Sequence, residues 1–228
     1  MSISTEKPQG PIGLTSGEDL RSVVFNLPNQ LTWLRLALTV VMFGLISWEY
    51  YAVSLVMFLV AASTDWLDGY FARKYNLVTT LGRILDPFAD KVIICGTFIY
   101  LAAVPPAITG ESASEIAAWM AVVVVARELL VTALRSFFEE HGTDFSAKWA
   151  GKWKMVLQCA AVAASLARLW HYRYEGGGWD VEPPAWSTWS VRLLVWAAIA
   201  MTVYSGWGYV QAAVRLLRSK DPGARSMQ

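Results

Sequence analysis

Four aspartates stand at regular spacing in one apolar stretch of the chain. They are Asp65, Asp68, Asp86 and Asp90, and the segment between residues 65 and 90 reads DWLDGYFARKYNLVTTLGRILDPFAD. A single aspartate at bilayer depth costs about 2.5 to 3.5 kcal/mol on insertion scales. Four acids in adjacent spans must be offset by pairing, by a bound cation or by a hydrated cavity, which points to a functional site.

Helical spacing gives these acids two faces that can meet. Successive residues of an α-helix are rotated by about 100°. On the first of two predicted helices, one face about 100° wide therefore carries Asp65, Asp68, Gly69 and Ala72. The second helix carries a stripe at successive i+4 steps, which comprises Gly82, Asp86 and Asp90. With a rise of about 1.5 Å per residue, both stripes lie in the same half of the membrane. We therefore predict that the four carboxylates converge on one site.

Converging carboxylates need a counter-charge, because like charges in a low-dielectric site oppose one another's ionisation. The segment offers oxygen donors without histidine or cysteine, which favours a hard ion such as Mg²⁺, Mn²⁺ or Ca²⁺ over zinc or copper. The small residues Gly69, Ala72 and Gly82 would leave room for an extended ligand, and Arg73 could pair with its phosphate. Close packing of helices explains the same small residues equally well.

The composition indicates that these helices belong to a membrane protein. The chain has 228 residues, of which 55% are hydrophobic and 16% are charged, with a mean hydropathy of +0.38. Such a chain is too apolar for an ordinary soluble domain, and we expect no nucleic-acid partner. Six apolar segments are long enough to span a bilayer, at about residues 31–48, 50–75, 82–104, 116–138, 153–170 and 189–210. We predict an all-α membrane protein with six transmembrane helices.

The chain divides into three parts around these spans. Residues 1–25 form a disordered or interfacial segment that includes a short amphipathic helix near residues 18–25, residues 26–218 form the six-helix catalytic domain, and residues 219–228 form a cytoplasmic tail. Lysine and arginine gather at the chain ends and in the loops on the same side. By the positive-inside rule, both termini and the acidic site face the cytoplasm. We expect an integral protein of a bacterial inner membrane.

The acidic segment resembles the signature of a known family. The pattern D-x2-D-G-x2-A-R-x8-G-x3-D-x3-D of the CDP-alcohol phosphotransferases is matched without a gap by Asp65, Asp68, Gly69, Ala72, Arg73, Gly82, Asp86 and Asp90. The segment NLPNQLTWLR (residues 26–35) resembles the start of the first span in that family. Further on, ARELLVTALR (126–135) and GKWKM (151–155) are similar to the branch that makes phosphatidylglycerophosphate.

The resemblance implies a six-span fold, an activity and roles for named residues. The activity is transfer of a phosphatidyl group from CDP-diacylglycerol to sn-glycerol 3-phosphate, with release of CMP, by direct attack of the acceptor hydroxyl. The family likeness implies two Mg²⁺ or Mn²⁺ ions held by Asp65, Asp68, Asp86 and Asp90, with Asp90 also acting as general base. It implies a nucleotide pocket lined by Asn29, Thr32, Asp65, Gly69, Ala72, Arg73 and Gly82. It further implies a homodimer among membrane lipids.

The identity of the acceptor depends on a second, cationic set. Arg127, Arg135, Lys152 and Lys154 stand on the fourth and fifth predicted spans or at their ends, and an anionic acceptor such as glycerol 3-phosphate would need such a clamp. A buried pair between Arg127 and Glu128, with ordinary cytoplasmic lysines, would explain the same charges. The alternatives are another acceptor in the same family (inositol phosphate, serine or phosphatidylglycerol), a divalent-cation transporter, or a catalytically silent scaffold.

Overall fold

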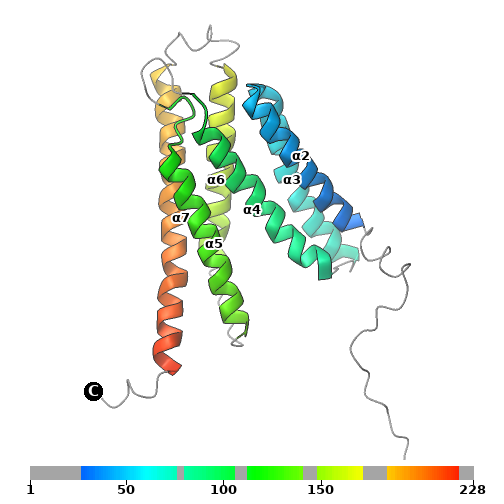
Figure 1. Ribbon diagram of the computed structural model, residues 1–228, viewed down its shortest axis with the longest axis vertical. Coiled ribbons are helices and arrows are strands. Elements are labelled where there is room, and N and C mark those ends of the chain that lie inside the picture. The colour runs from blue at the N-terminus through cyan, green and yellow to red at the C-terminus, as the bar shows by residue number, and fades with distance from the viewer. Residues whose placement is uncertain (1–26, 76–79, 106–111, 141–147, 172–183, 221–228) are drawn as a thin grey trace, which may run out of the picture.

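The described part of the chain forms six long helices (Figure 1). The computed structural model describes residues 27–75, 80–105, 112–140, 148–171 and 184–220. The helices are α2 (Leu27–Ser47), α3 (Tyr51–Tyr75), α4 (Thr80–Ala102), α5 (Ala118–Glu140), α6 (Lys148–Trp170) and α7 (Ala185–Lys220). One helix covers each of the six predicted apolar segments. The amphipathic helix predicted near residues 18–25 lies outside the described residues.

The helix ends differ from the predicted spans where polar residues continue a helix beyond its apolar stretch. α7 runs from Ala185 to Lys220, whereas the apolar pattern predicts only residues 189–210. α6 begins at Lys148, five residues before the predicted start, because lysine and alanine are good helix formers although lysine is not apolar. α2 begins with Leu27 and carries Pro28 in its first turn, where no backbone N–H is required.

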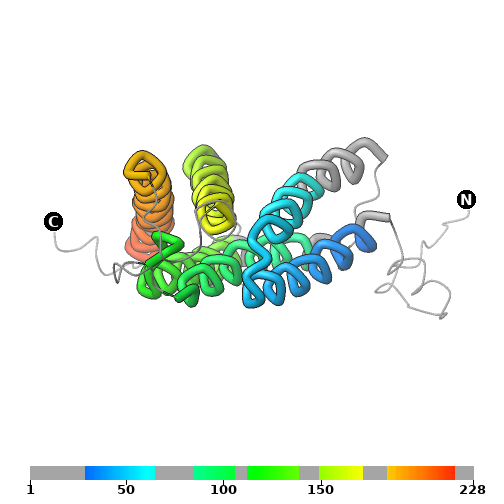
Figure 2. The backbone as a smooth tube through the Cα atoms, turned by 90° about the horizontal axis from the view of Figure 1, so that it is seen from above, coloured from blue at the N-terminus to red at the C-terminus, as the bar shows by residue number. Residues whose placement is uncertain are grey.

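The helices pack in two layers of three. Figure 2 shows α2, α4 and α5 side by side in one layer, and α3, α6 and α7 in the other. The contacts between layers are α2 with α3, α4 with α6 and α5 with α7. This arrangement places α4, which carries Asp86 and Asp90, between α2 and α5. Side chains from both neighbours can therefore reach the face of α4.

The core is concentrated toward the end of the bundle where α2 ends and α3 begins. One cluster joins all six helices and includes Phe58, Phe98, Val124, Leu166 and Val195. A smaller cluster, formed by Val131, Phe138, Tyr209, Ala212 and Ala213, lies between α5 and α7 toward the opposite end. Figure 1 shows that α3 and α4 diverge from α5 and α7 toward that opposite end. The acidic stripe of α4 lies in this diverging part.

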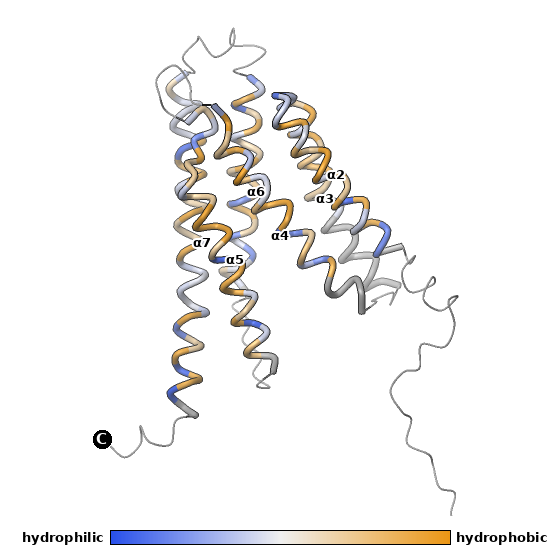
Figure 3. Tube along the Cα trace, viewed as in Figure 1, coloured by the Kyte–Doolittle hydropathy of each residue, from blue (hydrophilic) through white to orange (hydrophobic). Residues whose placement is uncertain are grey.

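The bundle buries several polar side chains and exposes many large apolar ones. Buried side chains include Arg35, Thr97, Gln158, Ser165 and Thr202. Large apolar side chains are exposed on every helix, among them Val41, Val56, Ile99, Val122, Val156 and Leu193. Figure 3 shows apolar residues recurring along the helices. Two helical stretches, residues 29–47 and 185–218, are long and apolar enough to cross a membrane by themselves. These features indicate an integral membrane protein, because exposed apolar surface of this extent needs lipid around it.

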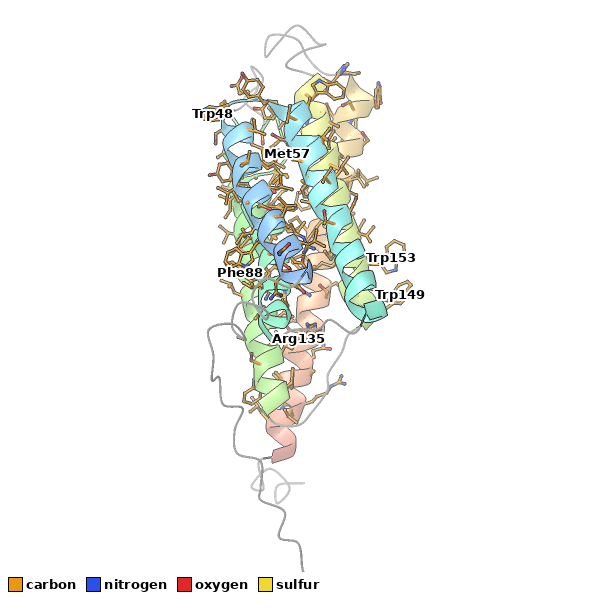
Figure 4. All side chains as sticks on the ribbon, turned by 90° about the vertical axis from the view of Figure 1, so that its right-hand side faces the viewer. Trp48, Met57, Phe88, Arg135, Trp149 and Trp153 are labelled. Atoms are coloured by element: carbon orange, nitrogen blue, oxygen red, sulfur yellow. The ribbon has the colours of Figure 1, made fainter. Side chains whose placement is uncertain are left out.

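Exposed tryptophans occupy both ends of the bundle. Trp48 projects at one end, and Trp149 and Trp153 project at the other, with their ring centroids 5.6 Å apart (Figure 4). Indole rings prefer the boundary between lipid and water. The two sets therefore indicate the two faces of the membrane, and the acids of α4 lie nearer the face of Trp149 and Trp153.

An ion network fastens α5, α6 and α7 at the end opposite the acids. Glu115, just before α5, accepts hydrogen bonds from Arg168 Nη1 at 2.8 Å and from Arg192 Nε at 2.9 Å. The backbone of Glu115 is left-handed, with φ of 60°, a conformation that costs a non-glycine residue about 1 to 3 kcal/mol. This conformation brings one carboxylate to two helices and fixes the start of α5.

Candidate active site

Two acids of α4 each accept a hydrogen bond from a buried side chain of α2. Thr32 Oγ1 donates to Asp86 Oδ1 at 2.5 Å, and Arg35 Nη1 donates to Asp90 Oδ1 at 3.1 Å. Thr32 and Arg35 are buried, whereas the Asp90 side chain is 33% exposed and Asp86 is half-buried. Thr32 and Arg35 thus contact the two acids from the buried interior of the bundle. The carboxylates are held from within the bundle and face its more open end.

The regular offset between the two helices produces these pairs. α2 and α4 run in the same direction, and partners along them differ by 54 or 55 positions in number. Thr32 and Arg35 are three residues apart and Asp86 and Asp90 are four apart, so each pair shares one face of its helix. A single register between α2 and α4 therefore aligns both donors with both acids.

A glycine further along α4 sets how closely α2 can approach. A Cβ atom at Gly96 would lie 2.1 Å from Cζ of Phe43, whose ring stacks on Tyr100 with centroids 4.7 Å apart. Only glycine leaves space for this ring against α4. The packing of Phe43 over Gly96 continues the register that pairs Thr32 with Asp86.

The remaining predicted metal and nucleotide residues are placed only in part. Asn29 is fully buried on α2, in the turn before Thr32. α3 contains Asp65, Asp68, Gly69, Ala72 and Arg73, and α4 contains Gly82, so each lies on a helix as predicted. The side chains of these last six residues lie outside the described residues. The convergence of the α3 acids with Asp86 and Asp90 stays a prediction.

The two described carboxylates of α4, Asp86 and Asp90, are suitable ligands for a hard divalent ion. Both are carboxylates one helical turn apart, and each accepts a hydrogen bond at Oδ1, from Thr32 or from Arg35. Oriented carboxylate oxygens are the ligands that Mg²⁺ and Mn²⁺ prefer. Among the side chains that the structure describes, no three acidic, histidine or cysteine groups gather at one point. A complete site would therefore need the acids of α3.

A second polar cluster lies inside the bundle between α5, α6 and α7. Glu128 accepts hydrogen bonds from Arg127 Nη1, at 3.0 Å, and from Lys154 Nζ. Arg127 Nη2 donates to Ser205 Oγ at 3.0 Å, and Gly206 makes room for the Arg127 side chain. All three charged side chains are buried. Two of the cations predicted to bind the acceptor phosphate, Arg127 and Lys154, thus share the acid Glu128. The pair between Arg127 and Glu128 is the alternative explanation that the sequence left open.

The other two predicted acceptor cations lie apart from this cluster. Lys152 is exposed on α6, because residues two apart on a helix point about 200° apart and Lys154 points inward. Arg135 is exposed on α5 and donates to the hydroxyl of Tyr209 at 3.2 Å. It lies eight residues, or about 12 Å along the helix, beyond Arg127. The four cations do not form one clamp in this structure.

Sequence reasoning did not identify Arg35 or Glu128 as site residues. Arg35 belongs to the segment that resembles the family, but its partner Asp90 stands 55 positions away. A signal was present, since Arg35 is a charged residue inside an apolar span, three positions after Thr32. The second partner of Glu128, Lys154, lies 26 positions away and could not be read from spacing within one helix.

Comparison with known proteins places the chain in a family. The family model described as CDP-alcohol phosphatidyltransferase matches residues 25–205. The chain is 34% identical over 213 residues to the CDP-diacylglycerol–glycerol-3-phosphate 3-phosphatidyltransferase of Bacillus subtilis (strain 168), which covers 87% of this chain and 100% of the relative. It is 32% identical over 195 residues to the protein of the same name from Escherichia coli (strain K12), which covers 83% of this chain and 95% of the relative. The chain therefore belongs to the CDP-alcohol phosphatidyltransferase family and is an enzyme of that class.

Proposed function

We propose that this enzyme transfers the phosphatidyl group of CDP-diacylglycerol to sn-glycerol 3-phosphate, giving phosphatidylglycerophosphate and CMP. The observation that carries the proposal is the pair of oriented acids on α4, Asp86 and Asp90, each held by a buried donor of α2. Two curated relatives whose names state this reaction support it, since they align along most of this chain.

The chemistry assigns a separate task to each part of the site. The acceptor hydroxyl attacks the phosphorus that carries the diacylglycerol, the new O–P bond forms, and the P–O bond to CMP breaks. Asp90 takes the hydroxyl proton, and its partly exposed carboxylate suits contact with a substrate. Asp86 and the α3 acids Asp65 and Asp68 would hold the divalent ions. Bound Mg²⁺ or Mn²⁺ would neutralise charge that develops on the diphosphate oxygens.

The nucleotide pocket lies between α2, α3 and α4 in this proposal. Asn29 and Thr32 would close it from α2, and Arg73 would pair with the diphosphate. The small residues Gly69, Ala72 and Gly82 would let the nucleotide lie close to the helices. The burial of Asn29 and Thr32 supports this arrangement, as does the hydrogen bond from Thr32 to Asp86 on α4.

An anionic acceptor is supported by the buried cations of α5 and α6. Arg127 and Lys154 share one acid, Glu128, so this cluster keeps one net positive charge. The buried Nε of Arg127 has no hydrogen-bond partner among the described residues, and buried donors of this kind are usually satisfied by a ligand or by water. Arg135 and Lys152 would act nearer the water, where glycerol 3-phosphate enters.

The membrane arrangement completes the proposal. All six helices would span the bilayer of a bacterial inner membrane, with both termini and the acids at the cytoplasmic side, and two copies would form a homodimer. α2 and α7 each contain an apolar stretch long enough to cross a membrane, and charged residues interrupt the apolar stretches of α3, α4, α5 and α6. A site in the cytoplasmic half gives water-soluble CMP an exit while the acyl chains stay in lipid.

One assay tests the proposed reaction. Purified protein in detergent receives CDP-diacylglycerol, Mg²⁺ and labelled glycerol 3-phosphate, and we expect labelled phosphatidylglycerophosphate with one CMP released per product. EDTA should stop the reaction and added Mg²⁺ should restore it. Product with inositol phosphate, serine or phosphatidylglycerol in place of glycerol 3-phosphate would overturn the acceptor. Movement of Mg²⁺ into liposomes without any lipid product would overturn the enzyme proposal.

A further inference from the structure

Arg35 is a charged side chain in the interior of the bundle, on a helix that carries no other charged residue. Its exposure is 2%, and it is among the largest fully buried side chains of the described chain. Its Nη1 donates to Asp90 Oδ1 at 3.1 Å. Burying a guanidinium costs several kcal/mol unless an acid compensates it. Asp90 therefore offsets part of the cost of burying Arg35, and Arg35 in turn restrains the Asp90 carboxylate.

The exposure of the two partners is unequal. The Arg35 side chain is 1% exposed and the Asp90 side chain is 33% exposed. The guanidinium therefore contacts the carboxylate from the interior, while the carboxylate reaches the more open part of the bundle. A planar guanidinium fixes the orientation of a carboxylate better than an ammonium does, because its N–H groups have fixed directions. Contact with Oδ1 fixes the direction in which the second oxygen, Oδ2, faces.

The residues one turn before and one turn after Arg35 on this face of α2 are also polar. Thr39 Oγ1 donates to the carbonyl of Arg35 at 2.7 Å, one turn further along α2. Thr32, one turn before, donates to Asp86. Arg35 thus lies in the middle of a polar stripe of α2 that follows the acidic stripe of α4. The alignment holds over two successive turns, which a single fortuitous ion pair would not require.

We propose that Arg35 is a positioning residue for the reaction, which orients the Asp90 carboxylate so that Oδ2 accepts the proton of the acceptor hydroxyl. This inference rests on the proposed role of Asp90 as general base. Arg35 itself touches no reacting atom. Its removal should therefore slow the chemical step while substrate binding is kept, because orientation within less than 1 Å decides the rate of such steps.

The test compares Arg35→Gln and Arg35→Lys with Thr39→Val as a matched control on the same buried face. Steady-state kinetics, binding of CDP with Mn²⁺ followed by electron paramagnetic resonance, and thermal unfolding in detergent are measured for each. We expect Arg35→Gln to lower kcat about 100-fold, with both KM values and CDP–Mn²⁺ affinity within about threefold of wild type. Arg35→Lys keeps the charge but loses the planar guanidinium, and its kcat should be about tenfold higher than that of Arg35→Gln. Thr39→Val should keep kcat within about twofold.

The outcomes separate a positioning role from a structural one. Arg35→Gln with wild-type kcat and only a lowered unfolding temperature would overturn the inference, as would a loss confined to CDP–Mn²⁺ binding. If Arg35→Gln does not fold, Arg35→Lys decides, since a wild-type kcat in that variant contradicts the need for a guanidinium. If the proposed function itself is wrong, the wild-type enzyme will make no product from glycerol 3-phosphate, an outcome that does not depend on Arg35.

Discussion

Single side chains of α2 hold the two acids of α4 in place. Thr32 and Arg35 each donate to one carboxylate oxygen, so the acids of α4 are preorganised by the protein before any ligand binds. Carboxylates that bind metal or take protons are usually oriented in this way by a second polar group. Substitutions of Thr32 or Arg35 should therefore lower activity even when Asp86 and Asp90 are unchanged.

Replacing Thr32 by valine tests this orientation at constant side-chain shape. The variant loses the hydrogen bond to Asp86, and a bond to a charged acceptor contributes about 1.5 to 3 kcal/mol. We expect kcat/KM to fall about tenfold or more, measured as CMP release over a range of Mg²⁺ concentrations. Thr97→Val is the control, because the buried Thr97 hydroxyl donates to the carbonyl of Ile93, one turn earlier in the same helix. Equal activities of the two variants would contradict the role of Thr32.

Glu128 is the residue on which the inner cationic cluster depends for stability. Glu128→Gln would leave Arg127 and Lys154 buried without their acid, which costs about 3 to 5 kcal/mol when a buried ion pair loses one partner. We expect a clearly lower unfolding temperature in detergent. Arg215→Gln, which removes a charge from the exposed surface of α7, is the control and should unfold like wild type. Wild-type stability of Glu128→Gln would mean that another group compensates the two cations.

The sequence predicts part of the residue-scale picture. The spacing of Gly82, Asp86 and Asp90 placed both acids on one helix face, and α4 confirms that they lie on a helix. The split between Lys152 and Lys154 follows from 100° per residue and could have been predicted. The partners of Asp90 and Glu128 could not be predicted, because pairing across 55 or 26 positions depends on how whole helices pack.

At the scale of elements, the register between α2 and α4 positions the site. Thr32 with Asp86, Arg35 with Asp90, and Phe43 with Gly96 lie in that order along two parallel helices. A shift or a wider separation of the helices would break both hydrogen bonds together. The close approach at Gly96 is therefore coupled to the acids more than one helical turn away.

Gly96→Ala tests this coupling. The new Cβ would meet the Phe43 ring at 2.1 Å, and the ring is stacked on Tyr100, so overpacking should cost about 1 to 3 kcal/mol and lower activity. Phe43→Leu in the same chain should restore part of both, because the clash is relieved. Gly44→Ala is a matched control on α2, where an added Cβ meets nothing within 4 Å. Unfolding temperature and CMP release are measured for wild type and all three variants, and wild-type behaviour of Gly96→Ala would contradict the coupling.

Hydropathy located the helices but not their full lengths. Each predicted span contains one helix, because long apolar runs form helices in a membrane. The last helix continues through Gln211, Arg215 and Arg218 to Lys220, where polar residues end the apolar pattern but do not break a helix. The two-layer order, with α4 between α2 and α5, had no signal in the sequence because it depends on packing between distant segments.

At the scale of the whole molecule, the two ends of the bundle have different tasks. The end with Glu115 holds most of the shared core and an ion network, whereas the end with Asp86 and Asp90 diverges. We therefore propose that stability and catalysis depend on opposite ends of the bundle. Substitutions in the Glu115 network should therefore alter stability without altering the chemistry.

Glu115→Ala removes the acid that joins Arg168 and Arg192, and should cost about 3 to 5 kcal/mol. We expect a lower unfolding temperature, with kcat and both KM values within about twofold of wild type at a temperature where the variant is folded. Glu115→Gly separates the two effects of this position, because glycine adopts φ of 60° without strain and should lose less stability than alanine. A large change in kcat with unchanged stability would contradict the separation.

We propose that acids of α3 and α4 together hold the divalent ions that bind the diphosphate. Mn²⁺ binding in the presence of CDP, followed by electron paramagnetic resonance, tests it in Asp68→Asn, in Asp86→Asn and in the double variant. We predict that each single variant loses most high-affinity Mn²⁺ and that the double variant loses little more, since the acids act on shared ions. Independent losses that add in the double variant, or wild-type Mn²⁺ binding in either single variant, would contradict the account.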